Sequence, residues 1–534
     1  MLNTLSPTVA PSSKLESTNR GSDKQPSNWV RWVLPSIADV FFLVLLGIRA
    51  FGPAGKALLG DADTGWHIRN GEIIWATRAV PHTDSFSYTR SGQPWFAWEW
   101  LYDLVIGAIH HVAGLDGVVL FTAVIIAATF ALLFHFILRR SGSFAVAVAL
   151  TLLAAAAAQV HMLARPHVLS WLFTMLWVEA LYRFEEGKTS ALYWLPPLML
   201  LWVNVHGGFI LGLVMLGIFG VARVWTYAAA RRKEDLRDIV KLALTMCACL
   251  GATFITPYGY QLHVHVYQYL SNGFLMNSIS EFMSPNFHAE GYGYFELLIL
   301  LCVLGMMWAR ELVSVTDLII LLFALHAGLY AARNIPISAI LIGLALGPAL
   351  AAAISPGRQE QPQWMASLLD AVHDISANMS EMERRFKYHA LALIMLAGAM
   401  AIALNGGRVG SAQVLSAHFD EKEFPVAATE FIARKGIHDH MFNSDSWSGY
   451  LIYKLYPGMK VYFDDRHDFY GESFVREYLR ASNATWQWRE PLDRYEIKWA
   501  LVGANSPLAS VLKEDKGWLV QYDDGIAVVF QRTH

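Results

Sequence analysis

The chain has 534 residues, of which 55% are apolar and 16% are charged, whereas soluble globular domains carry about a quarter charged residues. This composition excludes a wholly soluble protein. The formal net charge of −3 and the lack of any basic tract argue against a nucleic-acid partner. Cys247, Cys249 and Cys302 fall inside apolar runs, so we expect buried thiols and neither a disulfide nor a metal site at these positions.

The N-terminal part of the chain predicts a tail followed by a membrane anchor. Residues 1–30 are polar and rich in Ser and Pro, which is typical of a disordered tail. The run 33–53 is long enough to span a bilayer and lacks a small-residue cleavage site, so it predicts a signal anchor. Within a predicted transmembrane domain over 31–405, further spans are expected at 115–138, 143–160, 167–184, 190–205, 209–230, 238–256, 293–309, 315–332, 335–354 and 389–405.

The segment 101–113 decides the orientation of everything after it. Its sequence, LYDLVIGAIHHVA, is amphipathic and predicts an interfacial or half-buried helix. If this segment is not counted as a span, the chain has about eleven spans and its loops alternate between the two sides of the membrane. The loops on the side of the N-terminus carry 14 Lys and Arg, and the loops on the opposite side carry 6, four of them in the first outer loop, 54–100. Because positive residues gather on the cytoplasmic side, the N-terminus is expected inside and the C-terminus outside.

The character of the sequence changes from about residue 406. The region 406–534 predicts a soluble extracytoplasmic α/β domain, because short alternating strands are separated by helices and turns. No glycine-rich phosphate loop follows any of its strands. The predicted helices are 425–435, 447–456, 471–482 and 507–514, and the predicted strands are 440–443, 460–465, 499–503, 518–524 and 526–532.

Polar residues gather on the predicted outer side. Ionisable groups near hydrocarbon are costly, so they usually line a cavity and pair with one another. Their placement on separate segments that all reach one membrane face predicts one shared pocket. The candidate site residues are Asp61, Asp63, Trp66, His67, Glu99, Arg165, His167, Asn204, His206, Glu281, Arg333 and Asn334.

The acidic motif has two interpretations. Asp61 and Asp63 precede a helix that begins near Thr64, so they can act as helix caps, or they can be catalytic or metal-binding residues. His67 follows Asp63 by four residues and shares its helical face. This spacing suits two ligands of a divalent ion, or a carboxylate that orients an imidazole.

The other candidates also have structural alternatives. Arg165 and Arg333 can snorkel at helix ends, or they can clamp a phosphate group, which the guanidinium fork matches. Asn204 and His206 can simply satisfy backbone groups beside the following glycines. Trp66 belongs to a tryptophan-rich loop that predicts an interfacial aromatic belt, with sugar-stacking platforms as the alternative.

At these residues the chain resembles the GT-C superfamily of membrane glycosyltransferases. The shared plan is a first transmembrane helix followed by a long outer loop with an acidic motif, which Asp61-Ala62-Asp63 matches here. The motifs DADTGWH, ARPH, NVHGGF and SPNF are also similar to a bacterial branch assigned to that superfamily. The resemblance covers 33–405 in architecture. The C-terminal domain lacks the WWDYG-type motif of oligosaccharyltransferases, of which DSWSGY at 445–450 is only a distant echo.

The resemblance implies a bacterial inner-membrane enzyme with a polyprenyl-phosphate sugar as donor. Its acceptor, whether glycan, lipid or protein, stays open. Asp61 or Asp63 would be the general base, with Glu99 as a reserve acid. The leaving phosphate would be stabilised by the two arginines, by His167 or by a divalent ion. No ATP would be needed, since the donor is already activated.

Two other functions fit the same residues. A transporter or flippase of a lipid-linked or small anionic substrate also needs charged groups near helix ends, although interrupted helices and a pseudo-symmetric repeat are more typical of it. A non-catalytic scaffold would only display the C-terminal domain to a partner. The scaffold predicts that the polar residues need not converge, whereas the glycosyltransferase predicts that they share one pocket of about 300–1,000 Å³.

Overall fold

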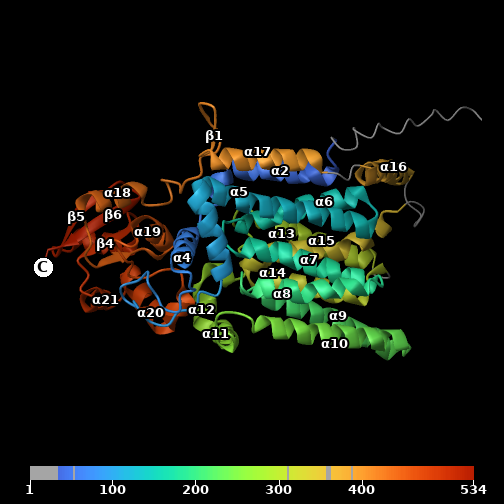
Figure 1. The fold of residues 1–534 in the computed structure, drawn as a ribbon, viewed down its shortest axis with the longest axis horizontal. Coiled ribbons are helices and arrows are strands. Elements are labelled where there is room, and N and C mark those ends of the chain that lie inside the picture. The colour runs from blue at the N-terminus through green and yellow to red at the C-terminus, as the bar shows by residue number, and fades with distance from the viewer. Residues whose placement is uncertain (1–33, 52–53, 310–311, 356–362, 386–388, 534) are drawn as a thin grey trace, which may run out of the picture.

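Apolar runs of helical length dominate the chain, and they form a helical bundle with a small domain at one end (Figure 1). The computed structural model describes residues 34–51, 54–309, 312–355, 363–385 and 389–533. The predicted tail, 1–30, lies outside these residues. The main helices before the C-terminal domain are α2 (Ile37–Phe51), α4 (Asp63–Thr77), α5 (Trp100–Ser141), α6 (Phe144–Ala158), α7 (His167–Glu185), α8 (Leu195–Val203), α9 (Phe209–Ala230), α10 (Lys233–Thr253), α11 (Tyr260–Ser271), α12 (Gly273–Ser278), α13 (Gly293–Trp308), α14 (Val315–Tyr330), α15 (Ile335–Ala353), α16 (Gln363–Arg385) and α17 (Ala390–Leu404).

Several of these helices have the length and composition of membrane spans. Among the described residues, four are long and apolar enough to cross a membrane: Trp100–Ser141, Phe144–His161, Phe209–Ala230 and Ala332–Ala353. Shorter apolar helices cover Thr189–Val203, Gly293–Trp308, Val315–Tyr330 and Ala390–Leu404. The mostly helical, membrane-type architecture is therefore observed, and the number of eleven spans stays a prediction.

Helix α5 contains the boundary expected between 101–113 and the following span. The backbone of Gly114 is non-helical (φ 58°, ψ −156°) and divides the helix there. A positive φ of this size is accessible to glycine at no steric cost. Helix α5 packs on α4, α2, α6 and α15. Before Gly114, Asp103 lies against Gly71 of α4, and after Gly114, Phe134 contacts the rings of Phe41 in α2 and Phe144 in α6.

The cysteines differ in part from expectation. Cys249 and Cys302 are buried free thiols, as expected, but Cys247 is exposed. Cys247 and Cys249 are two positions apart on α10, which places them on different faces of the helix. Only the face of Cys249 packs against neighbouring helices, so the prediction of a buried Cys247 was wrong.

The C-terminal domain is built around a four-stranded sheet. Its order is β3 (Met441–Asn443), β4 (Trp499–Gly503), β6 (Ala527–Arg532) and β5 (Trp518–Asp523), with β3 parallel to β4 and the other pairs antiparallel. These strands confirm four of the predicted five. The helices of this domain are α18 (Val426–Lys435), α19 (Ser448–Leu455), α20 (His467–Ser482), α21 (Arg489–Arg494) and α22 (Pro507–Glu514).

The predicted strand 460–465 was wrong. This segment does not join the sheet, because its backbone groups bond to a side chain of β3 and not to the backbone of that strand. Asn443 Oδ1 accepts the backbone N–H of Tyr462 at 2.8 Å, and Asn443 Nδ2 donates to the carbonyl oxygen of Phe463 at 2.9 Å. Its other edge pairs with the segment 54–100, which was predicted as the first outer loop, through an isolated bridge between Ser87 and Val461. The segment therefore ties the C-terminal domain to the loop that carries the acidic motif.

Helix α4 is held between α5 and α19 by close backbone contacts. A Cβ atom on Gly65 would lie 2.3 Å from the carbonyl oxygen of Gly449 in α19, and one on Gly71 would lie 1.8 Å from the carbonyl oxygen of Asp103 in α5. Only glycine permits such an approach. The acidic motif is thus fixed at the junction of the bundle and the C-terminal domain.

Candidate active site

The acidic motif meets the pocket at the start of α4. Asp61 Oδ1 accepts a hydrogen bond at 2.9 Å from the backbone N–H of Asp63, the first residue of the helix. The N-cap position itself is Ala62, which has no side-chain capping hydrogen bond, so Asp61 contacts the helix start from the residue before the cap and neither aspartate is the N-cap residue. The other oxygen, Asp61 Oδ2, lies 2.9 Å from Arg165 Nη1. Asp61 therefore supports the helix with one oxygen and pairs with an arginine through the other.

Arg165 pairs with three carboxylates. Its Nη2 lies 2.9 Å from Asp63 Oδ2, and its Nη1 lies 3.4 Å from Glu281 Oε2 in addition to the contact with Asp61. Burial alone would lower the pKa of the guanidinium, but Asp61 and Asp63 outweigh burial and raise that pKa well above its ordinary value. Arg165 is therefore a permanent positive charge inside an acidic cluster.

The two aspartates differ in basicity. Burial would raise the pKa of Asp63, but Arg165 and a hydrogen bond with Asp465 outweigh it, so that pKa is lowered. Asp63 Oδ1 also accepts the indole N–H of Trp66 at 3.1 Å. Burial raises the pKa of Asp61, although Arg165 opposes it. The Asp61 side chain is 23% exposed and that of Asp63 is 9% exposed, so Asp61 is the more basic and the more accessible group.

Glu281 lies between two arginines. Its Oε1 is 3.2 Å from Arg333 Nη1, and its Oε2 is 3.4 Å from Arg165 Nη1 and 3.5 Å from His161 Nε2. Burial would raise the pKa of Glu281, but Arg333 and Arg165 lower it to about 2. An ionised carboxylate thus occupies a position where two guanidinium groups could bind a different anion.

A second buried group of titratable side chains surrounds Glu99. His67 Nδ1 lies 2.6 Å from Asp103 Oδ1, and the Asn70 amide donates to Asp103 Oδ2 at 2.6 Å. Glu99 lies 3.8 Å from His67 Nε2 and 3.6 Å from His206 Nε2. Burial raises the pKa of Glu99 to about 7, against the opposing effect of His67. Glu99 can therefore gain or lose a proton near neutral pH.

These two groups of side chains line one cavity of about 1000 Å³. All of the predicted site residues except Asn204 line it. Part of the lining is apolar and comes from the bundle, and another part comes from the C-terminal domain. The apolar lining includes Ile210, Leu211, Phe323, Ala327 and Ile337, and the C-terminal lining includes Ser444, Asp445, Asp465, Arg466, His467, Asp468 and Tyr478.

Asn204 has a structural role outside the cavity lining. Its Oδ1 accepts the indole N–H of Trp100 at 2.8 Å, and its Nδ2 donates to the carbonyl oxygens of Leu200 and Ile255. These contacts join α8 to the start of α5 and to the end of α10. Of the two interpretations of Asn204, the structure therefore favours the satisfaction of backbone groups.

Two other predicted residues line the cavity with part of their bonding capacity already used. His167 Nε2 lies 2.8 Å from the carbonyl oxygen of His161, and the Asn334 amide donates to the carbonyl oxygen of Ala327 at 3.0 Å. The Trp66 ring stacks on His67 with centroids 3.7 Å apart. These contacts fix the orientation of the lining side chains.

The sequence reasoning missed the contribution of the C-terminal domain. Asp465 is the last residue of the segment that was predicted as a strand, His467 lies two residues after it, and Asp445 follows β3. His467 Nε2 lies 2.9 Å from Asp445 Oδ2. Burial raises the pKa of Asp465 well above its ordinary value, as do Asp63 and Asp445, which both hydrogen-bond to it. The signal that could have found these residues is the dense acidic and histidine run DDRHD at 464–468.

Two sets of side chains have the donor atoms for a metal ion. Among the described residues, the ligand atoms of Asp61, Asp63 and Asp465 lie within 4.8 Å of one another, and so do those of Asp445, Asp465 and His467. Hard divalent cations such as Mg²⁺ prefer carboxylate oxygens, so the first set has suitable chemistry. Asp63, a predicted ligand, belongs to that set, and the other predicted ligand, His67, faces Asp103 and Glu99 instead.

Comparison with known proteins gives two similar solved structures. No family model and no curated protein matches the sequence. The apo oligosaccharyltransferase of Archaeoglobus fulgidus matches with 10% identity and a TM-score of 0.47, covering 87% of this chain and 69% of that chain. Apo ArnT from Cupriavidus metallidurans matches with 14% identity and a TM-score of 0.47, covering 92% of this chain and 96% of that chain. This chain is similar to each of the two over most of its own length.

Proposed function

We propose that the protein is a membrane glycosyltransferase that moves a sugar from a polyprenyl-phosphate donor to an acceptor, at the end of the bundle where the C-terminal domain lies. The observation that carries this proposal is the convergence of acidic, basic and histidine side chains from separate segments on one cavity of about 1000 Å³. Such groups are costly to keep beside apolar helices without a use. A scaffold that displays the C-terminal domain has no need of this convergence.

The lining of the cavity suits a lipid-linked phosphate. Apolar side chains of α9, α14 and α15 provide a surface for a polyprenyl chain. Arg165 and Arg333 approach the same carboxylate from two sides, and guanidinium groups bind phosphate oxygens in the same manner as carboxylate oxygens. In this proposal the phosphate of the donor replaces Glu281 beside Arg333, and the two arginines then stabilise the charge of the leaving phosphate.

The acceptor hydroxyl must lose its proton as its oxygen bonds to the sugar and the bond between sugar and phosphate breaks. We assign this proton to Asp61, because its carboxylate is more exposed to the cavity than that of Asp63 and its pKa is raised, whereas the pKa of Asp63 is lowered. A base with a higher pKa is the stronger proton acceptor. Glu99, with its pKa near 7, is the reserve group for proton transfer.

A divalent cation fits the donor atoms of Asp61, Asp63 and Asp465. Such an ion would supply positive charge for the leaving phosphate. The three carboxylates would hold it, in place of their present pairing with Arg165 and with one another. A loss of donor turnover on chelation with EDTA, restored by Mg²⁺ or Mn²⁺, would support this part of the proposal, and full turnover in EDTA would exclude it.

The proposal is tested with the purified protein in lipid nanodiscs. The nanodiscs receive polyprenyl-phosphate sugars labelled in the sugar, together with a bacterial envelope extract as the source of acceptors. We expect the labelled donor to be consumed and the label to appear in a new product. Asp61→Asn should lower this rate by about 10²–10⁴-fold, the usual contribution of a general base. Asp439→Asn is the matched control, because Asp439 is an exposed carboxylate of the C-terminal domain.

Two outcomes would overturn the proposal. Consumption of the donor that is the same in the wild type, in Asp61→Asn and in the double variant Asp61→Asn/Asp63→Asn would remove the proposed base. Movement of the labelled lipid across a vesicle membrane with its sugar–phosphate bond intact would instead identify a flippase.

A further inference from the structure

The C-terminal domain contains a buried arginine that the proposed reaction does not use. The side chain of Arg466 is only 3% exposed, and its Nη2 lies 2.6 Å from Asp84 Oδ1 and 2.7 Å from Asp464 Oδ2. Its Nε donates to Asp464 Oδ1 at 2.7 Å. Asp84 belongs to the first outer loop, so this ion pair joins two parts of the chain that are 382 residues apart in sequence.

Both carboxylates are fixed by further hydrogen bonds. Asp84 accepts the backbone N–H groups of Phe86 and Ser87 at 3.1 Å and 3.0 Å and the Ser87 hydroxyl at 2.7 Å. Asp464 accepts the Tyr470 hydroxyl at 2.9 Å. Buried charges are retained where they are paired and their remaining hydrogen-bonding capacity is satisfied. The two carboxylates that pair with Arg466 meet this condition.

Aromatic rings enclose the guanidinium group. Its central carbon lies 4.5 Å from the ring centroid of Trp95, 5.2 Å from that of Phe86 and 5.1 Å from that of Phe469. Trp95 and Phe86 come from the first outer loop, and Phe469 comes from the C-terminal domain. A planar guanidinium can pair with carboxylates and stack on such rings at the same time, which a lysine ammonium does less well.

The two residues beside Arg466 line the cavity. Asp465 and His467 both contribute to its lining, and the ligand atoms of Asp465 lie within 4.8 Å of those of Asp61 and Asp63. Because Arg466 is directly bonded along the chain to both residues, anything that fixes Arg466 also fixes their backbone. Asp84 lies in the same loop as Glu99, another residue that lines the cavity.

We infer that Arg466 is a positioning residue, whose ion pairs with Asp84 and Asp464 hold the C-terminal domain against the first outer loop and thereby keep Asp465 and His467 beside the acidic motif. The C-terminal domain is then an integral half of the site and not a separately attached binding module. The effect on turnover rests on the proposed function, whereas the effect on the backbone of 461–468 does not.

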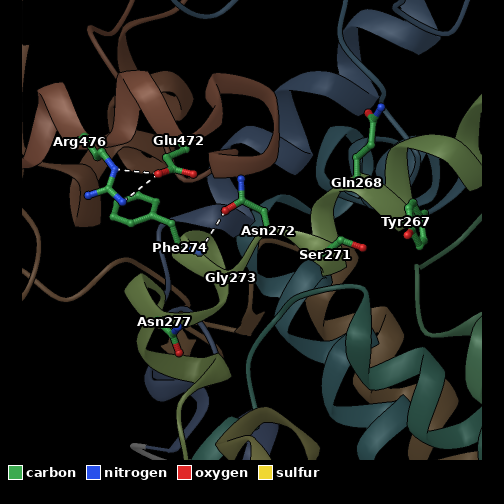
Figure 2. A pocket seen from close by; sticks show the side chains of 9 residues that line it. All are labelled: Tyr267, Gln268, Ser271, Asn272, Gly273, Phe274, Asn277, Glu472 and Arg476. Carbon is green, nitrogen blue, oxygen red and sulfur yellow. Dashed lines mark hydrogen bonds and ion pairs between the residues drawn. The ribbon is translucent and has the colours of Figure 1, made fainter.

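A nearby arginine provides the control. Arg476 of α20 also contacts an outer segment of the bundle, since its guanidinium carbon lies 3.8 Å from the Phe274 ring centroid, and it pairs with Glu472 at 2.8 Å (Figure 2). Its side chain is 57% exposed, and it lines a different, open pocket of about 790 Å³. Arg476→Met removes a guanidinium from the helix that directly follows Arg466, and Arg476 does not line the cavity that contains Asp465.

The experiment compares full-length wild type, Arg466→Met, Arg466→Lys, Asp84→Asn and Arg476→Met in nanodiscs. Hydrogen–deuterium exchange is measured by mass spectrometry on peptides that cover 461–468 and β4. We expect faster exchange at 461–468 in Arg466→Met and Asp84→Asn, unchanged exchange at β4, and wild-type behaviour in Arg476→Met.

The donor assay gives the kinetic effect of the same variants. In Arg466→Met and Asp84→Asn, kcat should fall by about 100-fold, as expected for a small misplacement of reacting groups. The KM for the donor should stay the same, because Arg165 and Arg333 are untouched.

The conservative and double variants complete the test. Arg466→Lys should recover part of kcat, and Asp84→Asn/Arg466→Met should be no worse than Arg466→Met alone, because residues that act as one unit are not additive. If Arg466→Met does not fold, Asp84→Asn, which keeps the side-chain volume, carries the test. Exchange at 461–468 equal to wild type in Asp84→Asn and Arg466→Met, or faster exchange with unchanged kcat, would overturn the inference. If wild type consumes no donor, the proposed function fails, and the exchange data alone decide whether Arg466 holds the loop.

Discussion

Arg333 Nη1 lies 3.2 Å from Glu281 Oε1, on the opposite carboxylate oxygen from the one that Arg165 approaches. The guanidinium carbon of Arg333 lies 4.5 Å from the ring centroid of Phe282, the residue after Glu281. Glu281 and Phe282 therefore both contact the Arg333 side chain. The two arginines are therefore already arranged around one anionic group. An incoming phosphate must compete with this group for Arg333.

Glu281→Gln removes the competing charge and keeps the side chain nearly the same size. We expect the variant to bind a polyprenyl phosphate about tenfold more tightly, which corresponds to about 1.4 kcal/mol. Isothermal titration in nanodiscs measures the Kd. Glu472→Gln is the control, because Glu472 pairs with Arg476 outside the cavity. Weaker binding by Glu281→Gln would mean that the carboxylate itself helps to hold the ligand.

Replacement of Arg165 should separate folding from ligand binding. Arg165→Met leaves Asp61, Asp63 and Glu281 without their shared partner, and loss of one partner of a buried ion pair costs about 3–5 kcal/mol. We expect about 3 kcal/mol, the lower end of this range, because the side chain is 19% exposed. Arg165→Lys keeps the charge and should fold, but a single ammonium cannot reproduce the guanidinium fork, so it should bind polyprenyl phosphate more weakly. Thermal unfolding and titration check the two expectations; a Met variant as stable as wild type would contradict the first.

The raised pKa of Glu99 predicts a pH dependence of stability. Between its ordinary pKa of 4.5 and its folded-state pKa of about 7, the folded protein holds a proton that the unfolded chain has lost. Stability therefore falls as the pH rises through this window, by about 3 kcal/mol in total, since one pKa unit corresponds to about 1.36 kcal/mol. Glu99→Gln should be more stable than wild type at pH 8 and should show no such advantage at pH 4.5. Melting temperatures of both proteins across this range test the prediction, and a constant difference between them would refute it.

Much of the bundle could be predicted because a membrane span is a local property of the sequence. About 20 apolar residues identify it without knowledge of its neighbours, and the break at Gly114 follows from the change from an amphipathic to an apolar pattern there. The convergence of Asp61, Arg165 and Arg333 could also be predicted, since the orientation rule brought them to one face before any contact was known.

The C-terminal half of the site could not be predicted because its contacts are not local. KVYFDD has the alternation of a strand, but it pairs with the distant segment 54–100, through Ser87 and Val461. Likewise, Arg466 pairs with its neighbour Asp464, but nothing near it in the sequence indicates that Asp84 is its second carboxylate partner. Periodicity reports that a segment is extended, but it does not identify the segment that pairs with it.

The contact between α4 and α19 gives a prediction that does not depend on any activity. A Cβ atom at Gly65 would lie 2.3 Å from the Gly449 carbonyl oxygen and 2.9 Å from Tyr453 Cβ, so Gly65→Ala must push the two helices apart. Overpacking of this kind costs about 1–3 kcal/mol, and here it separates the acidic motif from the C-terminal domain. Gly47→Ala in α2 is the control, because nothing lies within 4 Å of its added Cβ and alanine favours a helix by about 0.5–1 kcal/mol. Thermal unfolding measurements should therefore give a lower Tm for Gly65→Ala than for wild type, and an equal or higher Tm for Gly47→Ala. Equal effects of the two substitutions would show that the packing of α4 on α19 does not depend on the close contact between Gly65 and Gly449.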